Sequence, residues 1–339
     1  MNDKTNIGYW IRQFRAVLLP LGCVAGSLSG CSVRETPEGS AVPAGRPAEI
    51  RLQVQNLTRS IHSLTDLVSV GDNLGIYGVT VSDVSGAVPE GGWSSEHLVM
   101  ENVRTSGVDG ATGEIHWSGS YFYPAETDRY VRFSAYYPYA ADDRFSVDAS
   151  AGVPQLRFTL SGGEDLMFAG PTVGNASLHP DQLLFRHRLT QLSFCVADAG
   201  GAFSGATLLG IDITGTNTSG SMNLEDGSLG VWSVPADVAV PGIEPVVISG
   251  TPEAPQLVGG EVMLEPGCAS FRIRVTTSLG TFNDVEITPD SLLDGVPETT
   301  FAAGRAYRIT LTFRERNELV LSATVVPWQM AGGGSAVIE

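Results

Sequence analysis

Histidines and paired carboxylates are the residues in this sequence whose types could support catalysis or metal binding. Adjacent acids at 142–143 and at 225–226 are of the kind that serve as a catalytic acid–base pair or as calcium ligands. The five histidines show neither the spacing of metal ligands nor an HExxH motif: His62, His97, His116, His179 and His187. Because 37 acidic residues must find places on the surface, we interpret the acidic pairs as solvated turn residues. We therefore expect a protein that is not an enzyme and that needs neither a metal nor a cofactor.

A group of aromatic residues suggests a different kind of site, a platform on which sugars stack. The group consists of Trp93, Trp117, Tyr121, Phe122, Tyr123, Tyr136, Tyr137 and Tyr139. The alternative is the core of a β-sandwich with some exposed tyrosine edges, because large aromatic side chains dominate core packing. We favour the core interpretation.

The charge of the chain excludes several classes of function. The formal net charge is -17, so no basic surface is available to neutralise the phosphates of a nucleic acid. Lys4 is the only lysine, and it lies in an N-terminal leader. Once that leader is removed, no lysine amine remains for Schiff-base chemistry or for isopeptide bonds.

The N-terminal residues have the pattern of a signal peptide. Three basic residues, Lys4, Arg12 and Arg15, precede an apolar run over residues 16–28. That run is short for a membrane span, which needs about 20 apolar residues. We therefore predict a cleaved leader over residues 1–30.

The leader ends in "LSGC", residues 28–31, which resembles a bacterial lipobox. We expect cleavage after Gly30 and attachment of diacylglycerol to the Cys31 thiol, which would anchor the chain in a membrane. Cys23 in "PLGC" is a poorer site, and an ordinary secretory leader is the alternative. Residues 31–47 are rich in Pro, Gly, Ser and Glu and are predicted to form a flexible tether.

From residue 48 onward, apolar and polar residues alternate in many short stretches separated by turn residues. This pattern is typical of half-buried β-strands. The clearest stretches are residues 73–82, 130–139, 183–198, 208–215, 270–278, 306–315 and 318–328. A helical period is confined to one or two turns near residues 95–100. The sequence therefore predicts an all-β fold, and its length predicts two β-sandwich domains, residues 48–181 and 182–339.

Cys195 and Cys268 both lie in strand-like stretches. In an exported protein they could form a disulfide. The alternative, which we favour, is two buried free thiols.

The first predicted strand joins the tether to the N-terminal domain. In "AEIRLQVQNLTRS", residues 48–60, Ile50, Leu52 and Val54 alternate with polar residues and so share one face of an extended segment. Arg59 follows in a turn-like stretch and is a candidate protease cleavage site. The segment is either a permanent part of the core, with Arg59 as a solvated loop residue, or a removable piece.

A set of motifs occurs in the order found in a known family. They are "GDNLGIYG" (71–78), "YFYP" (121–124), "VRFSAYYPYA" (131–140), "DLMFAG" (165–170), "FRHRLTQLSF" (185–194), "TSGSMNLEDGSL" (218–229), and "AGRAYRITLTF" with "LSATVVPW" (303–328). Following a lipobox, this ordered set resembles the fimbrillin family of type V pilins over nearly the whole mature chain. His187, within the fifth motif, is expected to pack or hydrogen-bond at the domain border.

The resemblance implies a lipoprotein precursor of a surface filament, with two transthyretin-like β-sandwich domains in tandem. It also implies that an arginine-specific protease removes the first strand, here at Arg59, and opens a groove in the N-terminal domain. A strand of another subunit would then fill the groove, which is β-strand addition used for assembly. The implied partners are other fimbrial subunits and host or bacterial surface ligands. The implied location is a fimbria at the cell outer membrane, lipid-anchored and surface-exposed.

The candidate donor strand lies near the C-terminus, at residues 319–326. Leu319, Leu321, Ala323 and Val325 occupy one of its faces. Because the other face also carries apolar residues, the stretch is equally typical of an interior strand of the second domain, and we favour that interpretation.

Two functions of different classes remain open. The first is a structural subunit of a fimbria, as shaft, tip or anchor, that supports adhesion. The alternative is a monomeric surface lipoprotein that binds glycans or host ligands through a β-sandwich surface. Cleavage at Arg59 followed by polymerisation would distinguish them.

Overall fold

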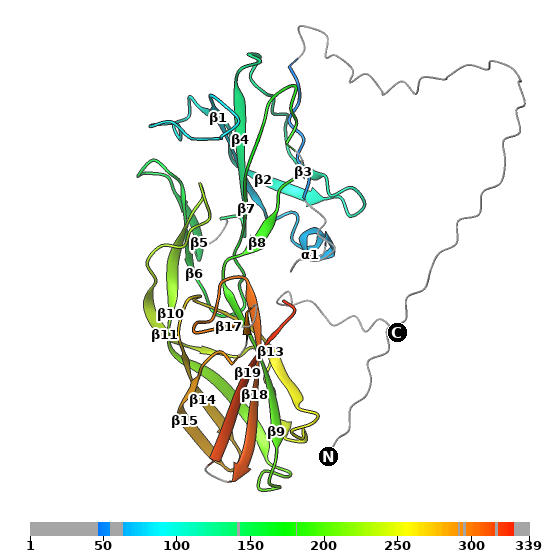
Figure 1. Cartoon of the computed structure of the whole chain (residues 1–339), viewed down its shortest axis with the longest axis vertical. Coiled ribbons are helices and arrows are strands. Elements are labelled where there is room, and N and C mark those ends of the chain that lie inside the picture. The colour runs from blue at the N-terminus through cyan, green and yellow to red at the C-terminus, as the bar shows by residue number, and fades with distance from the viewer. Residues whose placement is uncertain are drawn as a thin grey trace, which may run out of the picture. The chain divides into compact units, whose positions relative to one another are not determined.

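The computed structural model describes residues 47–54, 64–140, 143–180, 182–290, 292–293, 296–315 and 318–328. Across these residues the chain is built almost entirely of strands, with one short helix, α1 (Leu64–Ser69) (Figure 1). The prediction of an all-β fold is therefore confirmed. These residues all belong to one compact unit, Gly45–Glu339. The predicted signal peptide and lipidation site, with Gly30 and Cys31, lie outside the described residues.

The first sheet has six strands in the order β3-β2-β1-β4-β7-β8, and all neighbours are antiparallel. The strands are β1 (Gly75–Val81), β2 (Leu98–Val108), β3 (Ile115–Trp117), β4 (Tyr130–Tyr137), β7 (Met167–Gly174) and β8 (Phe185–His187). In β4, six consecutive residues are buried, because both faces of this central strand are covered. Val131 and Phe133 pack into one apolar cluster, whereas Tyr136 packs into another.

The second sheet is organised around one long strand, β10 (Thr207–Asn223). Its path is β15-β14-β10-β6-β5, and β11 and β12 also pair with β10. The other strands are β5 (Phe145–Asp148), β6 (Gln155–Thr159), β11 (Ser233–Ala239), β12 (Val246–Val247), β14 (Phe271–Thr277) and β15 (Gly280–Ile287). With 17 residues, β10 is long enough to pair with β14 through its first half and with β6 through its last five residues.

The third sheet has the order β13-β9-β18-β19. Its strands are β9 (Thr190–Asp198), β13 (Gln256–Leu264), β18 (Arg305–Glu315) and β19 (Glu318–Val326). The central strands β9 and β18 are parallel, and the two outer pairs are antiparallel. A short hairpin, β16 (Leu292–Leu293) with β17 (Val296–Pro297), lies apart from these sheets.

Strand pairing crosses the predicted domain border between residues 181 and 182 in both directions. β8 pairs with β7 in the first sheet, and β6 pairs with β10 in the second. A cluster of buried apolar residues also draws on all three sheets, with Tyr136 from β4, Phe158 from β6 and Met263 from β13. The division into two transthyretin-like domains stays a prediction.

Three local features differ from the pattern expected of the sequence. Residues 95–100, expected to form a helical turn, form a turn and the start of β2. The helix α1 was not expected, since its six residues are too few to show a helical period. Residues 183–198, which read as one alternating stretch, form two strands with a break at Arg188 and Leu189. The break is where the chain leaves the first sheet and enters the third.

Candidate functional site

Residues 47–54, here called the first segment, lie extended against the first sheet. Ile50, Leu52 and Val54 are each 1% exposed, so the alternation in the sequence corresponds to an inward face. They pack in one cluster with residues of β1, β2, β4 and β7, for example Ile76 and Phe133. The space that the first segment occupies is called the slot below.

Backbone hydrogen bonds hold the first segment along one flank. The amides of Ile50 and Val54 donate to the carbonyls of Tyr121 (2.8 Å) and Gly113 (2.9 Å). The segment in turn accepts bonds from the chain beside it. The Ile115 amide donates to the Leu52 carbonyl and the Tyr123 amide donates to the Ala48 carbonyl, each over 2.9 Å.

On the other flank, the Leu183 amide donates to the Gln53 carbonyl over 2.7 Å. The pairing there is parallel, whereas it is antiparallel toward residues 113–123. The first segment is therefore inserted between two other parts of the chain, although it forms isolated bridges rather than a continuous ladder. Its hydrogen bonds are those that an inserted strand would make.

The outward face of the first segment contributes little to its attachment. Arg51 lies 3.6 Å from Glu49 and 4.0 Å from Glu114, and its side chain is 71% exposed. Exposed ion pairs of this kind contribute little because water and salt screen them. The buried apolar face and the backbone bonds therefore hold the segment.

Gly113 allows a close approach of the chain to the first segment. Its φ is +74°, and a Cβ at this position would lie 2.8 Å from the Val54 carbonyl oxygen. We expect Gly113→Ala to lower the free energy of unfolding by about 1 to 3 kcal/mol, through backbone strain and loss of the Val54 contact. Urea unfolding measures this change.

Gly119→Ala is the matched control, because Gly119 has a similar φ of +86° but its Cβ would meet nothing within 4 Å. The two variants share the strain of a positive φ, so the difference between them reports the contact with the first segment. Equal losses in the two variants would mean that this contact does not matter.

The candidate cleavage site, Arg59, lies outside the described residues. The candidate donor strand is β19, which pairs with β18 along its length at the edge of the third sheet. Of its candidate residues, Ala323 is 1% exposed and belongs to the apolar cluster that contains Phe194 of β9. Leu319 and Leu321 are partly buried and pack against that cluster. Val325 is 39% exposed.

His187 lies in a buried cluster at the end of β8. Its Nδ1 lies 2.5 Å from the Asp165 Oδ2, and both side chains are almost fully buried. The imidazole stacks on Trp328, which follows β19, with ring centroids 3.7 Å apart. His187 therefore packs, which is one of the two roles expected of it, and lies against the Asp165 carboxylate; it joins the first sheet to the end of the third.

The acidic pairs are engaged in local structure. Glu225 accepts a hydrogen bond from Arg132 over 3.1 Å, and Asp226 accepts bonds from the Ser228 amide and hydroxyl. Asp143 is exposed, and its neighbour at 142 lies outside the described residues. Within the described ranges, no group of three or more His, Cys, Asp or Glu side chains is arranged to hold a metal ion.

The aromatic residues do not gather into one platform. Tyr121, Tyr123, Tyr137 and Trp117 pack into the cluster that contains the first segment, and Tyr136, Tyr139 and Trp93 pack into the cluster shared by the three sheets. Phe122 is 43% exposed. The core interpretation holds for most of the group.

Cys195 is buried, Cys268 is partly buried, and both are free thiols. Burial raises the pKa of both groups, and for Cys268 it reaches about 11, with the Glu265 carboxylate adding to the shift. Both thiols are therefore protonated at neutral pH, and a protonated thiol is a poor nucleophile.

Solved structures from Bacteroides species share this fold. A fimbrial protein from Bacteroides vulgatus is 13% identical with a TM-score of 0.54, and the match covers 83% of this chain and 100% of that one. A candidate cell adhesion protein from Bacteroides uniformis is 17% identical with a TM-score of 0.53, over 83% of this chain and 99% of that one. No curated protein matches the chain.

No helix in the described part of the chain is long and apolar enough to cross a membrane.

The model of the fimbrillin-like family matches residues 58–328, which is well over half of the chain. This match confirms the resemblance that the ordered motifs carry. The chain belongs to the fimbrillin-like family.

Proposed function

We propose that this chain is a structural subunit of a cell-surface fimbria, in which a strand of another subunit takes the place of the first segment. The observation that carries the proposal is the slot, where an N-terminal piece of chain supplies three buried side chains and five backbone hydrogen bonds. The Bacteroides vulgatus relative is described as a fimbrial protein, and the Bacteroides uniformis relative as a candidate cell adhesion protein. Both descriptions agree with this role.

Removal of the first segment would leave a strong template for another strand. Burial of Ile50, Leu52 and Val54 contributes about 5 to 9 kcal/mol, at about 1.5 to 3 kcal/mol for each side chain. Without the segment, the amides of Ile115, Tyr123 and Leu183 would lose their acceptors while an apolar cleft opened. An incoming strand with alternating apolar residues would satisfy both requirements.

In a filament made of this chain alone, the donor strand would be β19. In a mixed filament, a different subunit would supply the donor strand. Leu319, Leu321, Ala323 and Val325 have the alternation that the slot requires, and β19 occupies a sheet edge. Because β19 pairs with β18 along its length, donation requires its release from β18.

Export completes the proposed function. Cleavage after Gly30 and lipidation of Cys31 would anchor the precursor in the outer membrane, with the tether holding the folded part at the surface. The partners are then neighbouring fimbrial subunits and surface ligands to which the filament adheres. No catalytic role is proposed.

Treatment of the purified full-length precursor with an arginine-specific protease is expected to give a new N-terminus at Ser60 and oligomers that resist SDS. The physical reason is that the emptied slot favours capture of another chain's strand. N-terminal sequencing and gel electrophoresis measure the two results. Arg59→Ala is the control, and it should keep residues 47–54 attached to the chain and stay monomeric.

If the unmodified chain also keeps the first segment attached and stays monomeric, the proposal of strand exchange at the slot is wrong. That result would favour a monomeric surface lipoprotein that binds ligands, or an anchor subunit that is not processed. If cleavage occurs without oligomers, the opened slot requires a strand of a different subunit, and addition of that subunit must produce assembly.

A further inference from the structure

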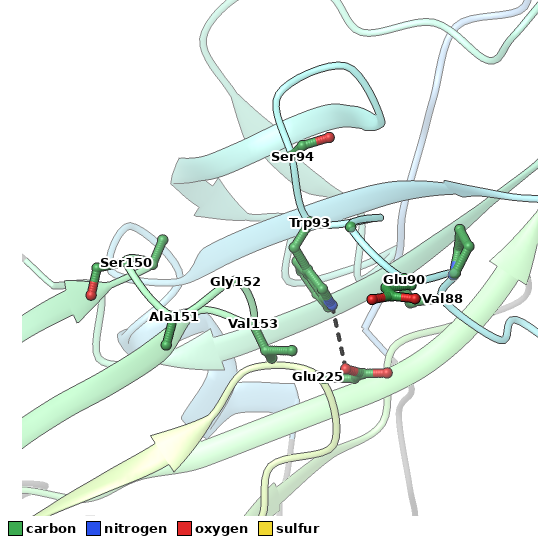
Figure 2. A pocket seen from close by; sticks show the side chains of 12 residues that line it. Val88, Glu90, Trp93, Ser94, Ser150, Ala151, Gly152, Val153 and Glu225 are labelled. Carbon is green, nitrogen blue, oxygen red and sulfur yellow. Dashed lines mark hydrogen bonds between the residues drawn. The ribbon is translucent and has the colours of Figure 1, made fainter.

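A pocket of about 510 Å³ lies away from the slot, where loops of the first and second sheets meet (Figure 2). One wall is the connection between β1 and β2, residues 88–94, and the other is the turn between β5 and β6, residues 149–153. Glu225, from the turn that follows β10, lies between these walls. The volume is that of a small-molecule site and accommodates one or two sugar rings.

Trp93 presents a fixed aromatic surface in this pocket. Its indole Nε1 donates to the Glu225 Oε2 over 3.3 Å, the interaction drawn in Figure 2. The ring also packs edge-on against Tyr77, with centroids 5.8 Å apart and an angle of 72° between the rings. Since its single donor is already used, the half-buried indole offers a ligand only its apolar face.

Glu225 is held in place by Arg132. The Arg132 Nη1 donates to the Glu225 Oε1 over 3.1 Å, and its Nη2 donates to the Glu225 carbonyl over 2.8 Å. The Arg132 side chain is 9% exposed, whereas that of Glu225 is 32% exposed. A carboxylate has about four acceptor positions, so Glu225 keeps acceptor capacity on its exposed side.

The other polar side chains that line the pocket are those of Glu90, Ser94 and Ser150. Glu90 is exposed on the wall opposite the turn between β5 and β6, Ser94 lies at the rim, and the Ser150 hydroxyl already donates to the Asp148 Oδ1. The pocket therefore combines an aromatic face with several acceptors and few donors. A pyranose ring has the complementary chemistry, an apolar C–H face and hydroxyl groups that donate outward.

The charges of the pocket favour a neutral ligand over a charged one. An anionic ligand would meet Glu90 and Glu225, while the Arg132 guanidinium faces away in its bonds to Glu225. A cationic ligand would find the Glu225 charge already compensated by Arg132 and would gain only from the exposed, solvent-screened carboxylate of Glu90. A neutral ligand meets no repulsion and does not depend on a screened charge.

We propose that this pocket binds a neutral pyranose residue of a glycan, with Trp93 as the stacking surface and Glu225 and Glu90 as acceptors for its hydroxyl groups. The site is independent of strand exchange at the slot. It would give the folded chain a ligand of its own, whether it stands alone or within a filament.

Saturation-transfer NMR of the purified full-length protein tests the proposal. The probes are methyl glycosides of glucose, galactose, mannose and N-acetylglucosamine. We expect transfer to at least one probe, and we expect Trp93→Ala to weaken its binding about tenfold through loss of stacking. Ala151→Trp, at an exposed position on the wall, should abolish transfer by filling the pocket.

Two matched pairs keep the result interpretable if a variant folds poorly. Glu90→Gln should weaken binding, whereas Glu126→Gln, at another exposed glutamate away from the pocket, should not. Trp117→Ala removes a half-buried tryptophan elsewhere and should leave transfer unchanged. Absence of transfer to all four probes, or equal transfer with Trp93→Ala and Ala151→Trp, would overturn the proposal. Transfer only to choline, added as a cationic probe, would overturn it in favour of a cation site.

Discussion

Leu52→Asp is expected to expel the first segment from the slot. It should weaken the free energy that attaches the segment by about 4 kcal/mol or more. Leu52 is 1% exposed, so a charge at this position must either be buried without a partner or leave with the segment. Because the Ile115, Tyr123 and Leu183 amides donate to the segment, these three should lose protection from hydrogen exchange. Amides within the β1–β4 pair should keep theirs. Exchange followed by NMR separates the two groups.

Gln53→Asp is the matched control, because it adds the same charge one residue away, on the exposed face. It should leave all of these amides protected. A synthetic peptide of residues 47–54 should restore protection in Leu52→Asp, since the slot would accept a strand supplied from outside. Unchanged protection in Leu52→Asp would show that the first segment is not a separable piece of the fold.

This experiment also separates the two ways in which the slot could matter. If the segment leaves while the sheets stay intact, the domain tolerates an open slot, which is what assembly by strand exchange requires. If the whole chain unfolds, the segment is a permanent part of the core. The attachment energy alone does not decide between these results, because the cost of an open slot depends on how far Ile115 and Leu183 relax around it.

The sequence predicted best what depends on neighbours along the chain. Alternation indicated β1, β4, β9, β18 and β19, because in each strand successive side chains point to opposite faces. The same alternation placed Ile50, Leu52 and Val54 on one face, and the structure has all three buried. Because the period of a strand is fixed, such a prediction needs only residues that are close together in the sequence.

Features that depend on distant partners were not predicted. The pocket brings Trp93 to Glu225 across 132 residues and Arg132 to Glu225 across 93 residues. Neither separation leaves a periodic signal, and Glu225 looked like one of many turn acids. The length of β10 was underestimated for a different reason: residues 216–221 are all Thr, Asn, Ser or Gly, so this part of the strand shows no alternation of apolar and polar residues.

Asp165→Ala is expected to lower the free energy of unfolding by about 3 to 5 kcal/mol. The change would leave His187 buried against Trp328 without the carboxylate that lies 2.5 Å from its Nδ1. The Leu166 amide, which donates to the Asp165 Oδ1 over 2.8 Å, would also lose its acceptor. Urea unfolding of the variant against the unmodified chain measures the loss.

The double variant Asp165→Leu with His187→Leu should recover part of this loss, because replacing the whole buried pair by apolar residues avoids leaving one buried polar group without its partner. Asp148→Ala breaks an exposed pair with Arg157 and should change stability much less. Equal effects of Asp165→Ala and Asp148→Ala would contradict a structural role for the buried pair. Since Trp328 lies two residues beyond the end of β19, loss of the His187 stack should also speed hydrogen exchange at Val326, which pairs with Ala306. The same cluster would then control how readily the candidate donor strand leaves β18.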